Sequence, residues 1–364
     1  MKLSSSRWRD TVVGILIPIG AVAGALLAGV LILVLAGVNP VKAYGPLLIG
    51  PFANLYGFAQ TITKATPLLL VGLGICIGFR GGVINIGGEG QIVAGALFTT
   101  WAGLQLRSLP GIVLVPLLLL TGFIGGALWG AVPGILKARL NASEILSTIM
   151  MNLIAAQGVS FLLRGPMIDP AEIAYGTGFP QSEALAEWAW LPRVIPRTTV
   201  HLGAIIALVM AVLVYVFLWR TTIGYRVRAV GYSKDASRYA GINVARYAIV
   251  AMLLSGGLAG LAGAVEVMGI HHRLLDGVSA GYGFTGIVAG LFGKLHPIGV
   301  IPASFLFGAL LVGADKMQRA VGVSPGIVYA LQGLVVLFVV SSDLWVRRRS
   351  ARRVEGGDEE VVND

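Results

Sequence analysis

The chain has 364 residues, of which 56 % are hydrophobic and 12 % are charged, and its formal net charge is +10. A soluble globular domain carries roughly 25 % charged residues, so this chain has too few charges to cover a soluble surface. The composition therefore argues against a soluble enzyme, a disordered chain and a nucleic-acid-binding domain. The 51 glycines follow no collagen period and are typical of helices that pack closely in lipid. The single cysteine, Cys76, excludes an intrachain disulfide.

Apolar runs long enough to cross a bilayer recur along the chain, since a spanning helix needs about 20 apolar residues. The first run, 11–37, follows a basic start, and a cleaved signal peptide is its alternative; the length of the run favours a span. Ten spans are predicted, at about 11–37, 61–79, 88–104, 111–136, 145–163, 198–218, 248–268, 283–294, 298–313 and 326–344. We therefore predict an all-α polytopic membrane protein with about ten transmembrane helices. The Gly-rich third and eighth spans are candidates for broken or re-entrant helices.

The distribution of charge orients these spans. Segment 219–247 holds six bases against one acid, and the exit after the last span is basic, whereas segment 164–197 holds three bases and four acids. The positive-inside rule places the basic segments in the cytoplasm and 164–197 outside. Both termini are then cytoplasmic, which requires an even number of spans.

These assignments give the predicted organisation. Residues 1–10 form a cytoplasmic N-terminus, 11–344 a transmembrane domain and 345–364 a disordered cytoplasmic tail. The Pro-rich outer loop is predicted to be irregular, with one short helix near 183–190. The sequence contains no phosphate-binding loop of the form G-x-x-x-x-G-K-[ST], so any ATP must be bound by another chain. We expect a non-enzymatic membrane subunit that binds no cofactor or metal itself.

The segment FRGGVINIGGEGQ, at 79–91, joins two apolar spans and places five glycines around Asn85, Glu89 and Gln91. Glycine permits close backbone approach, and polar groups at membrane depth usually face a cavity or a partner. One interpretation is a broken helix that lines a pathway for a polar solute. The other is an ordinary cytoplasmic turn with a solvated glutamate, and the spacing alone does not decide between them.

The segment SKDASRYAG lies in the basic loop 219–247. Ser233 is placed to cap a short helix with Asp235 in its first turn, Arg238 in its last turn and Gly241 just after it. Two turns of helix are marginal in water by themselves. The helix is therefore either a docking site for a cytoplasmic partner, with Ala236 and Tyr239 on its apolar face, or a solvated surface helix.

Two further spans carry isolated polar residues. Asn141 and Glu144 have the spacing of a capping box at the start of a span, and Asn152 lies two turns deeper, where it either bonds across helices or meets solute. In 266–276, His271 and His272 do not share a helix face and lack an evident third ligand, which disfavours a metal site. Glu266, near the end of a span, is the better candidate for the pathway.

The segment 281–294 is another Gly-interrupted short span. Its GFTGIVAGLFG is faintly similar to GEGQIVAGALF at 88–98, and paired interrupted spans are typical of transporters built from repeats. Phe284 is a candidate to stack on a solute ring, although a packing role is commoner.

At these segments the chain resembles the membrane permeases of bacterial ABC importers for simple sugars, nucleosides and branched-chain amino acids, over about residues 11–344. FRGGVINIGGEGQ is similar to the F-R-x-G-x-x-N-I-G-x-E-G-Q signature of that family, with Gly88 where Ala is usual. The stretch 141–152 is similar to its N-E-x-x-x-T-x-M-x-N element, with Ser143 where Asn is frequent. GYRVRAVGYSKDASRYAGINV and GFTGIVAGLFGKLHPIGVIPASFLFGAL resemble its ATPase-docking loop and its later block. The closest resemblance is to the nucleoside-type subgroup.

The resemblance implies an inner-membrane permease subunit that forms the pathway for a nucleoside or simple sugar. Its partners would be a dimer of cytoplasmic ATPases that bind ATP and Mg, a second permease (copy or paralogue) and an extracytoplasmic solute-binding lipoprotein, with no nucleic acid. It implies a solute pathway at Asn85, Glu89 and Gln91 and ATPase docking at 233–241.

Two other classes of function remain at this point. An ion-coupled secondary transporter of a small polar solute would also use broken helices and a buried Glu89, but it would need no docking loop. A scaffolding membrane protein is disfavoured by the polar, Gly-broken central span. The sequence does not distinguish a nucleoside from a sugar, nor a paired copy from a paralogue.

Overall fold

The computed structural model describes residues 20, 23–176 and 178–324, together with 326–327, 330–331, 333–334, 337–338 and 341. The predicted cytoplasmic N-terminus, the predicted tail, and parts of the first and last predicted spans lie outside the described residues.

The described part of the chain is helical, which confirms the all-α class. Its only β-type pairings are two isolated bridges, Gln181–Leu275 and Arg193–His201. After a first helix, Ala23–Leu35, the α-helices are α2 (Pro40–Leu48), α3 (Leu55–Arg80), α4 (Gly88–Gln105), α5 (Gly111–Leu140), α6 (Glu144–Leu163), α7 (Pro170–Tyr175), α8 (Gly203–Arg220), α9 (Thr222–Tyr232), α10 (Lys234–Tyr239), α11 (Val244–Glu266), α12 (Tyr282–Phe292) and α13 (Pro297–Val321). Short 3₁₀ turns at Gly50–Phe52 (η1) and Glu187–Ala189 (η2) and a π-helical turn at Val267–His271 (η3) complete the set.

Six of the described helices are long and apolar enough to cross a membrane: α3, α5, α6, α8, α11 with its π-helical turn, and α13. The chain is therefore a multi-pass α-helical membrane protein, but the described residues support six spans rather than the predicted ten. The predicted span at 283–294 forms α12, whose 11 residues rise about 16 Å and cannot cross the hydrocarbon core. The predicted span at 88–104 forms α4, whose first turn carries Glu89 and Gln91. It is not among the six helices that are long and apolar enough to cross a membrane.

The chain divides into two compact units, and the division falls within α13. The first unit comprises 1–53 and 310–364. Among its described residues, Lys316 Nζ donates a hydrogen bond to the Gly50 carbonyl at 2.5 Å. Its apolar cluster consists of Leu33, Ala43, Leu47, Ala314, Met317, Val323 and Leu331.

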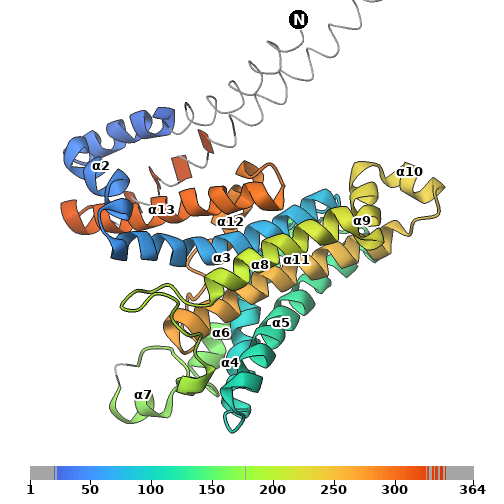
Figure 1. The fold of residues 1–364 in the computed structure, drawn as a ribbon, viewed down its shortest axis with the longest axis horizontal. Coiled ribbons are helices and arrows are strands. Elements are labelled where there is room, and N and C mark those ends of the chain that lie inside the picture. The colour runs from blue at the N-terminus through green and yellow to red at the C-terminus, as the bar shows by residue number, and fades with distance from the viewer. Residues whose placement is uncertain are drawn as a thin grey trace, which may run out of the picture. The chain divides into compact units, whose positions relative to one another are not determined.

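The second unit, 54–309, is built around α11, which packs against α3, α4 and α5. Helix α3 lies against α11 and also contacts α8 (Figure 1). Glycines make this close packing possible: a Cβ at Gly260 of α11 would overlap the Gly122 carbonyl oxygen of α5, and a Cβ at Gly95 of α4 would overlap the Gly260 carbonyl oxygen. Such contacts between backbones are typical of helix packing in membranes, where small residues let helices approach.

The two ends of this unit differ. Helix α10 lies at one end and α7 at the other (Figure 1). At the α7 end, the loop between α6 and α8 is attached to the segment after α11, because Trp190 stacks on His272 at 3.9 Å between ring centroids and Ser182 donates its backbone N–H to the Leu274 carbonyl. The short helix predicted near 183–190 is a single 3₁₀ turn, whereas α7, capped by Asp169, was not predicted.

His201 lies in this attachment, at the start of α8. Its ring is buried against Gly269, and its Nδ1 accepts a hydrogen bond from the Gly203 N–H at 3.2 Å. Burial, with a smaller contribution from His272, lowers the pKa of His201 from 6.5 to about 4. The folded protein therefore holds this imidazole neutral at pH 7.

Replacing Gly260 with Ala should destabilise the second unit by about 1–3 kcal/mol, because the new methyl group meets backbone atoms that cannot rotate away. Thermal unfolding of the purified protein in detergent measures the loss. Gly45→Ala in α2 is the matched control, since no atom lies within 4 Å of the position that a Cβ would occupy there. Equal unfolding temperatures for the two variants would contradict this explanation of the packing.

The stability of the protein should fall as the pH drops from about 6.5 toward 4. In this window the unfolded chain binds a proton at His201 that the folded chain does not bind. The free energy of unfolding therefore falls by at most about 3 kcal/mol by pH 4. Unfolding temperatures measured between pH 4 and pH 7 test this, with His201→Phe expected to show a shallower pH dependence. Identical profiles for the two proteins would refute the assignment.

Candidate functional site

The helical path is interrupted between α3 and α4, at 81–87, which both interpretations of this segment predict. Gly81 ends α3, and Gly82 adopts φ +70°, a conformation that favours glycine. Gly231 of α9 approaches this turn so closely that a Cβ there would overlap the Arg80 carbonyl oxygen and lie 2.8 Å from Gly82 N. The interruption is therefore in backbone contact with the end of α9.

Asn85 is buried at the centre of the interruption and uses its whole amide. Its Nδ2 donates to Gln91 Oε1 at 2.9 Å and to Ser255 Oγ of α11 at 2.8 Å. Its Oδ1 accepts from the Gly87 N–H at 2.9 Å and from Gln91 Nε2 at 3.1 Å. The network joins the α3–α4 turn, α4 and α11, and it leaves neither amide of the Asn85–Gln91 pair without a partner.

Glu89 joins two helix starts. It lies in the first turn of α4, and its Oε1 accepts the Gly283 N–H at 2.7 Å and the Phe284 N–H at 3.3 Å, both in the first turn of α12. The backbones touch at the same place, since a Cβ at Gly88 would lie 3.2 Å from Gly283 Cα. A carboxylate is favoured at a helix N-terminus by the unpaired N–H groups and by the helix dipole. The Glu89 carboxylate lies at two such termini: it is in the first turn of α4, and it accepts hydrogen bonds from the first turn of α12.

Asn152 of α6 completes the interruption. Its Oδ1 accepts the Gly90 N–H at 2.8 Å, and its Nδ2 donates to the Ile86 carbonyl at 3.0 Å. Of the two roles predicted for Asn152, the structure shows the bond across helices.

The two similar segments, 88–98 and 283–293, are brought together at their first residues, because Gly88 contacts Gly283. Their next turns pack crosswise: Gly95 of α4 lies against α11, and Gly290 of α12 lies against Gly72 and Ile75 of α3. Each repeat thus packs against the helix that precedes the other repeat. This arrangement gives the faint sequence similarity a structural counterpart.

The other predicted pathway residues lie at different depths. Phe284, which is 52 % exposed, donates its backbone N–H to Glu89. Glu266 is only 1 % exposed, at the far end of α11, with His271 Nε2 3.7 Å from its Oε2 and no hydrogen-bond partner for Oε1. The structure therefore gathers Asn85, Glu89, Gln91 and Asn152 with Phe284, and it places Glu266 elsewhere. Within the described residues no group of three potential metal ligands occurs.

One local prediction is wrong. Asn141 and Glu144 do not form a capping box, because Asn141 ends α5 in a left-handed conformation, with φ +50°, and Ser143 caps α6 through the Leu146 N–H. Glu144 instead pairs with Lys137 Nζ at 2.7 Å.

Helix α10 confirms the predicted caps. Ser233 Oγ accepts the Ala236 N–H at 3.2 Å, Asp235 pairs with Arg238 in the exposed first and last turns, and Gly241 has φ +75°. Tyr239 is 98 % exposed and Tyr232, at the end of α9, is 96 % exposed. Exposed tyrosines beside a capped short helix form a surface suited to a protein partner.

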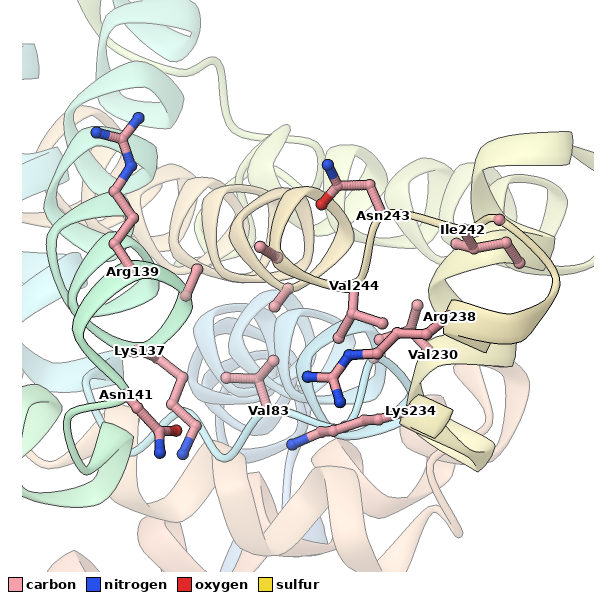
Figure 2. Close-up of a pocket in the computed structure, with 16 residues that line it drawn as sticks. Val83, Lys137, Arg139, Asn141, Val230, Lys234, Arg238, Ile242, Asn243 and Val244 are labelled. Carbon is pink, nitrogen blue, oxygen red and sulfur yellow. The ribbon is translucent and has the colours of Figure 1, made fainter. Parts of the chain in front are cut away.

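A pocket of about 630 Å³ separates α10 from the end of α5. Figure 2 shows Lys234 and Arg238 of α10 on one side, Lys137 and Asn141 on the other, and Val83 of the α3–α4 turn between them. The pocket therefore connects the exposed helix to the helix interruption.

Comparison with known proteins identifies the family. The sequence model of the family described as "branched-chain amino acid transport system / permease component" matches residues 57–340. The chain belongs to this family. It is therefore the permease subunit of an ABC transporter, a membrane subunit and not itself an enzyme.

Individual relatives extend over most of the permease. It is 36 % identical to the guanosine ABC transporter permease protein NupP of Bacillus subtilis, over 90 % of this chain and 93 % of that protein. It is 34 % identical to the glucose ABC transporter permease protein TsgB13 of Haloferax volcanii, over 91 % and 88 %. It is 31 % identical to the nucleoside ABC transporter permease protein NupB of Lactococcus lactis, over 89 % and 90 %. No solved structure matches the chain.

Sequence reasoning did not assign to the site three side chains of the permease that support it, those of Ser255, Arg80 and Trp219. Ser255 binds Asn85 from α11, and its isolated hydroxyl in a Gly-rich apolar helix was the available signal. Arg80 donates to the Leu295 carbonyl at 2.6 Å and lies over the Trp219 ring of α8 at 4.8 Å, which ties the end of α3 to two other elements. No sequence spacing indicates these long-range partners.

Asn85→Leu should destabilise the permease by about 3 kcal/mol or more, because the change leaves Gln91, Ser255 and the Gly87 N–H without their buried partner. The unfolding temperature of the purified variant and its uptake rate in vesicles are the measurements. Gln105→Leu is the control, since it removes an exposed amide at the far end of α4. A stable Asn85→Leu variant with full uptake and unchanged solute preference would count against the site.

Proposed function

We propose that this permease imports a nucleoside or a simple sugar. The observation that carries the proposal is the similarity, over about nine tenths of both chains, to relatives named for guanosine, nucleosides and glucose.

The proposed orientation follows from charge. The basic elements α9 and α10 face the cytoplasm, and α7 with its loop faces the outside of a bacterial plasma membrane. Their placement at opposite ends of the second unit supports this (Figure 1). In this orientation both termini are cytoplasmic, which requires an even number of membrane crossings in the whole chain.

In this proposal α10 docks onto the ATPase through Ser233, Asp235, Ala236, Arg238, Tyr239 and Gly241. The caps hold the short helix, and the exposed Tyr239 and Arg238 supply the aromatic and charged contacts that dominate many interfaces. Tyr232 enlarges the same surface. ATP and Mg bind to the ATPase dimer, which works with a second permease and a solute-binding lipoprotein.

The contact between α9 and the helix interruption couples ATP hydrolysis to the pathway. Helix α9 leads directly into α10, and Gly231 touches the backbone at Arg80 and Gly82 without an intervening side chain. Displacement of α10 by the ATPase therefore presses on the turn that holds Asn85. From there the Asn85–Gln91 pair and Glu89 transmit the movement to the starts of α4 and α12, beside the exposed Phe284.

Tyr239→Ala combined with Arg238→Glu should lower the amount of ATPase that co-purifies with the permease at least tenfold and abolish ATP-dependent uptake. The reason is that truncation of an exposed aromatic anchor and reversal of a charge remove the main contacts of a small interface. Tyr175→Ala on α7, which removes an equally exposed tyrosine from the opposite end, is the control. Normal ATPase recovery with the double variant, or uptake that collapses with an uncoupler and not with ATP depletion, would refute the proposal.

A further inference from the structure

Helix α6 has two unlike faces. One face packs on α4 and α5 through a buried stripe of Thr148, Asn152, Ala155, Val159 and Leu163. Gln157 lies on the opposite face and is exposed. At 3.6 residues per turn it shares that face with the exposed side chains of Leu146, Met150, Leu153 and Phe161.

Gln157 differs from the exposed residues of the neighbouring membrane-spanning helices. On α5 and α8 the large exposed hydrophobic side chains are aliphatic, as expected for contact with lipid. They include Ile112, Val113, Leu120, Ile124, Leu128, Val132 and Ile135 on α5, and Ile205, Leu208, Val209, Val212, Leu213 and Val216 on α8.

The amide of Gln157 lies inside a helix long and apolar enough to cross a membrane, and it has no hydrogen-bond partner among the described residues. It is 13 residues from the start of α6 and six from its end, so it lies about 20 Å and 9 Å from the two ends of the helix. None of the hydrogen bonds within the described part of the chain involves the Gln157 side chain. An amide left in lipid without hydrogen bonds costs several kcal/mol, so this face of α6 meets something polar in the assembled transporter.

Polar groups continue from Gln157 toward the outer end of α6. Ser160 and Arg164 follow it at three and seven residues, close to the same face of the helix. Ser160 Oγ donates to Asp276 Oδ2 at 3.1 Å, and Arg164 Nε donates to Ser160 Oγ at 3.2 Å. In the opposite direction the face is apolar, at Leu153 and Met150. The hydrophilic line therefore runs inward from the outer end of α6 and stops at Gln157.

We propose that Gln157 binds the transported solute at the inner end of this line. The inference rests on the proposed function, and it deepens that function by naming a residue that selects the solute. A primary amide both donates and accepts, which suits the edge of a nucleobase or a pair of sugar hydroxyls. Phe161, one turn outward and 72 % exposed, offers a ring face on which a base or sugar stacks.

The experiment uses the complete transporter, purified through a tagged permease and reconstituted into liposomes with its solute-binding protein. ATP-dependent uptake of labelled guanosine and of labelled glucose is measured for the wild type, Gln157→Leu and Gln157→Asn. We expect Gln157→Leu to raise the KM for the transported solute about tenfold, because one hydrogen bond to the solute is lost. Gln157→Asn, which keeps the amide, should recover part of the affinity. Ile149→Leu, an aliphatic exchange elsewhere on α6, should leave KM unchanged.

The rival explanation is that Gln157 bonds to a helix of the second permease. In that case Gln157→Leu would lower the recovery of the second permease in the purified complex, and this result would overturn the proposal. An unchanged KM for Gln157→Leu in an intact complex would overturn it as well. Absence of ATP-dependent uptake in the wild-type complex would instead refute the proposed function, and this inference with it.

Discussion

The arrangement of the site depends on one constraint: where a helix is interrupted in a buried part of the protein, its freed backbone groups must find hydrogen-bond partners within the protein. Between α3 and α4, side chains of the interruption and of the helices around it meet this requirement. Asn85 accepts the Gly87 N–H, Asn152 binds both Gly90 and Ile86, and Glu89 accepts the first N–H groups of α12. The polar residues of the signature segment are thus part of the architecture that holds the interruption in place, and not isolated groups in a cavity.

Glycine packing makes those bonds possible. Because α11 touches α4 and α5 backbone to backbone, Ser255 comes within 2.8 Å of Asn85. The same absence of side chains recurs at Gly231, where α9 meets the end of α3. Helix α10 carries an exposed surface with charged residues and a tyrosine, and it follows α9 directly in the chain. The close contact of Gly231 with the end of α3 therefore links α10, through α9, to the interruption.

Much of this was predictable from sequence. Hydropathy indicated the membrane class, the glycines around Asn85 indicated the helix interruption, and Ser233 with Gly241 set the bounds of α10. The number of crossings was not predictable, because apolar composition does not distinguish the 11-residue α12 from a full span. The capping box at Asn141 failed because the spacing fits two different turns. The partners of Ser255 and Trp219 could not be predicted, since Asn85 and Arg80 are distant from them in sequence and only the fold brings them near.

The shared carboxylate at Glu89 also limits which sequences this fold accepts. An aspartate there is one methylene shorter, and it reaches the Gly283 N–H only if α12 shifts toward α4. The backbones already touch at Gly88 and Gly283, so no such shift is available. Positions 89 and 283 are consequently constrained together, because a Cβ at Gly283 would overlap the backbone nitrogen of Glu89.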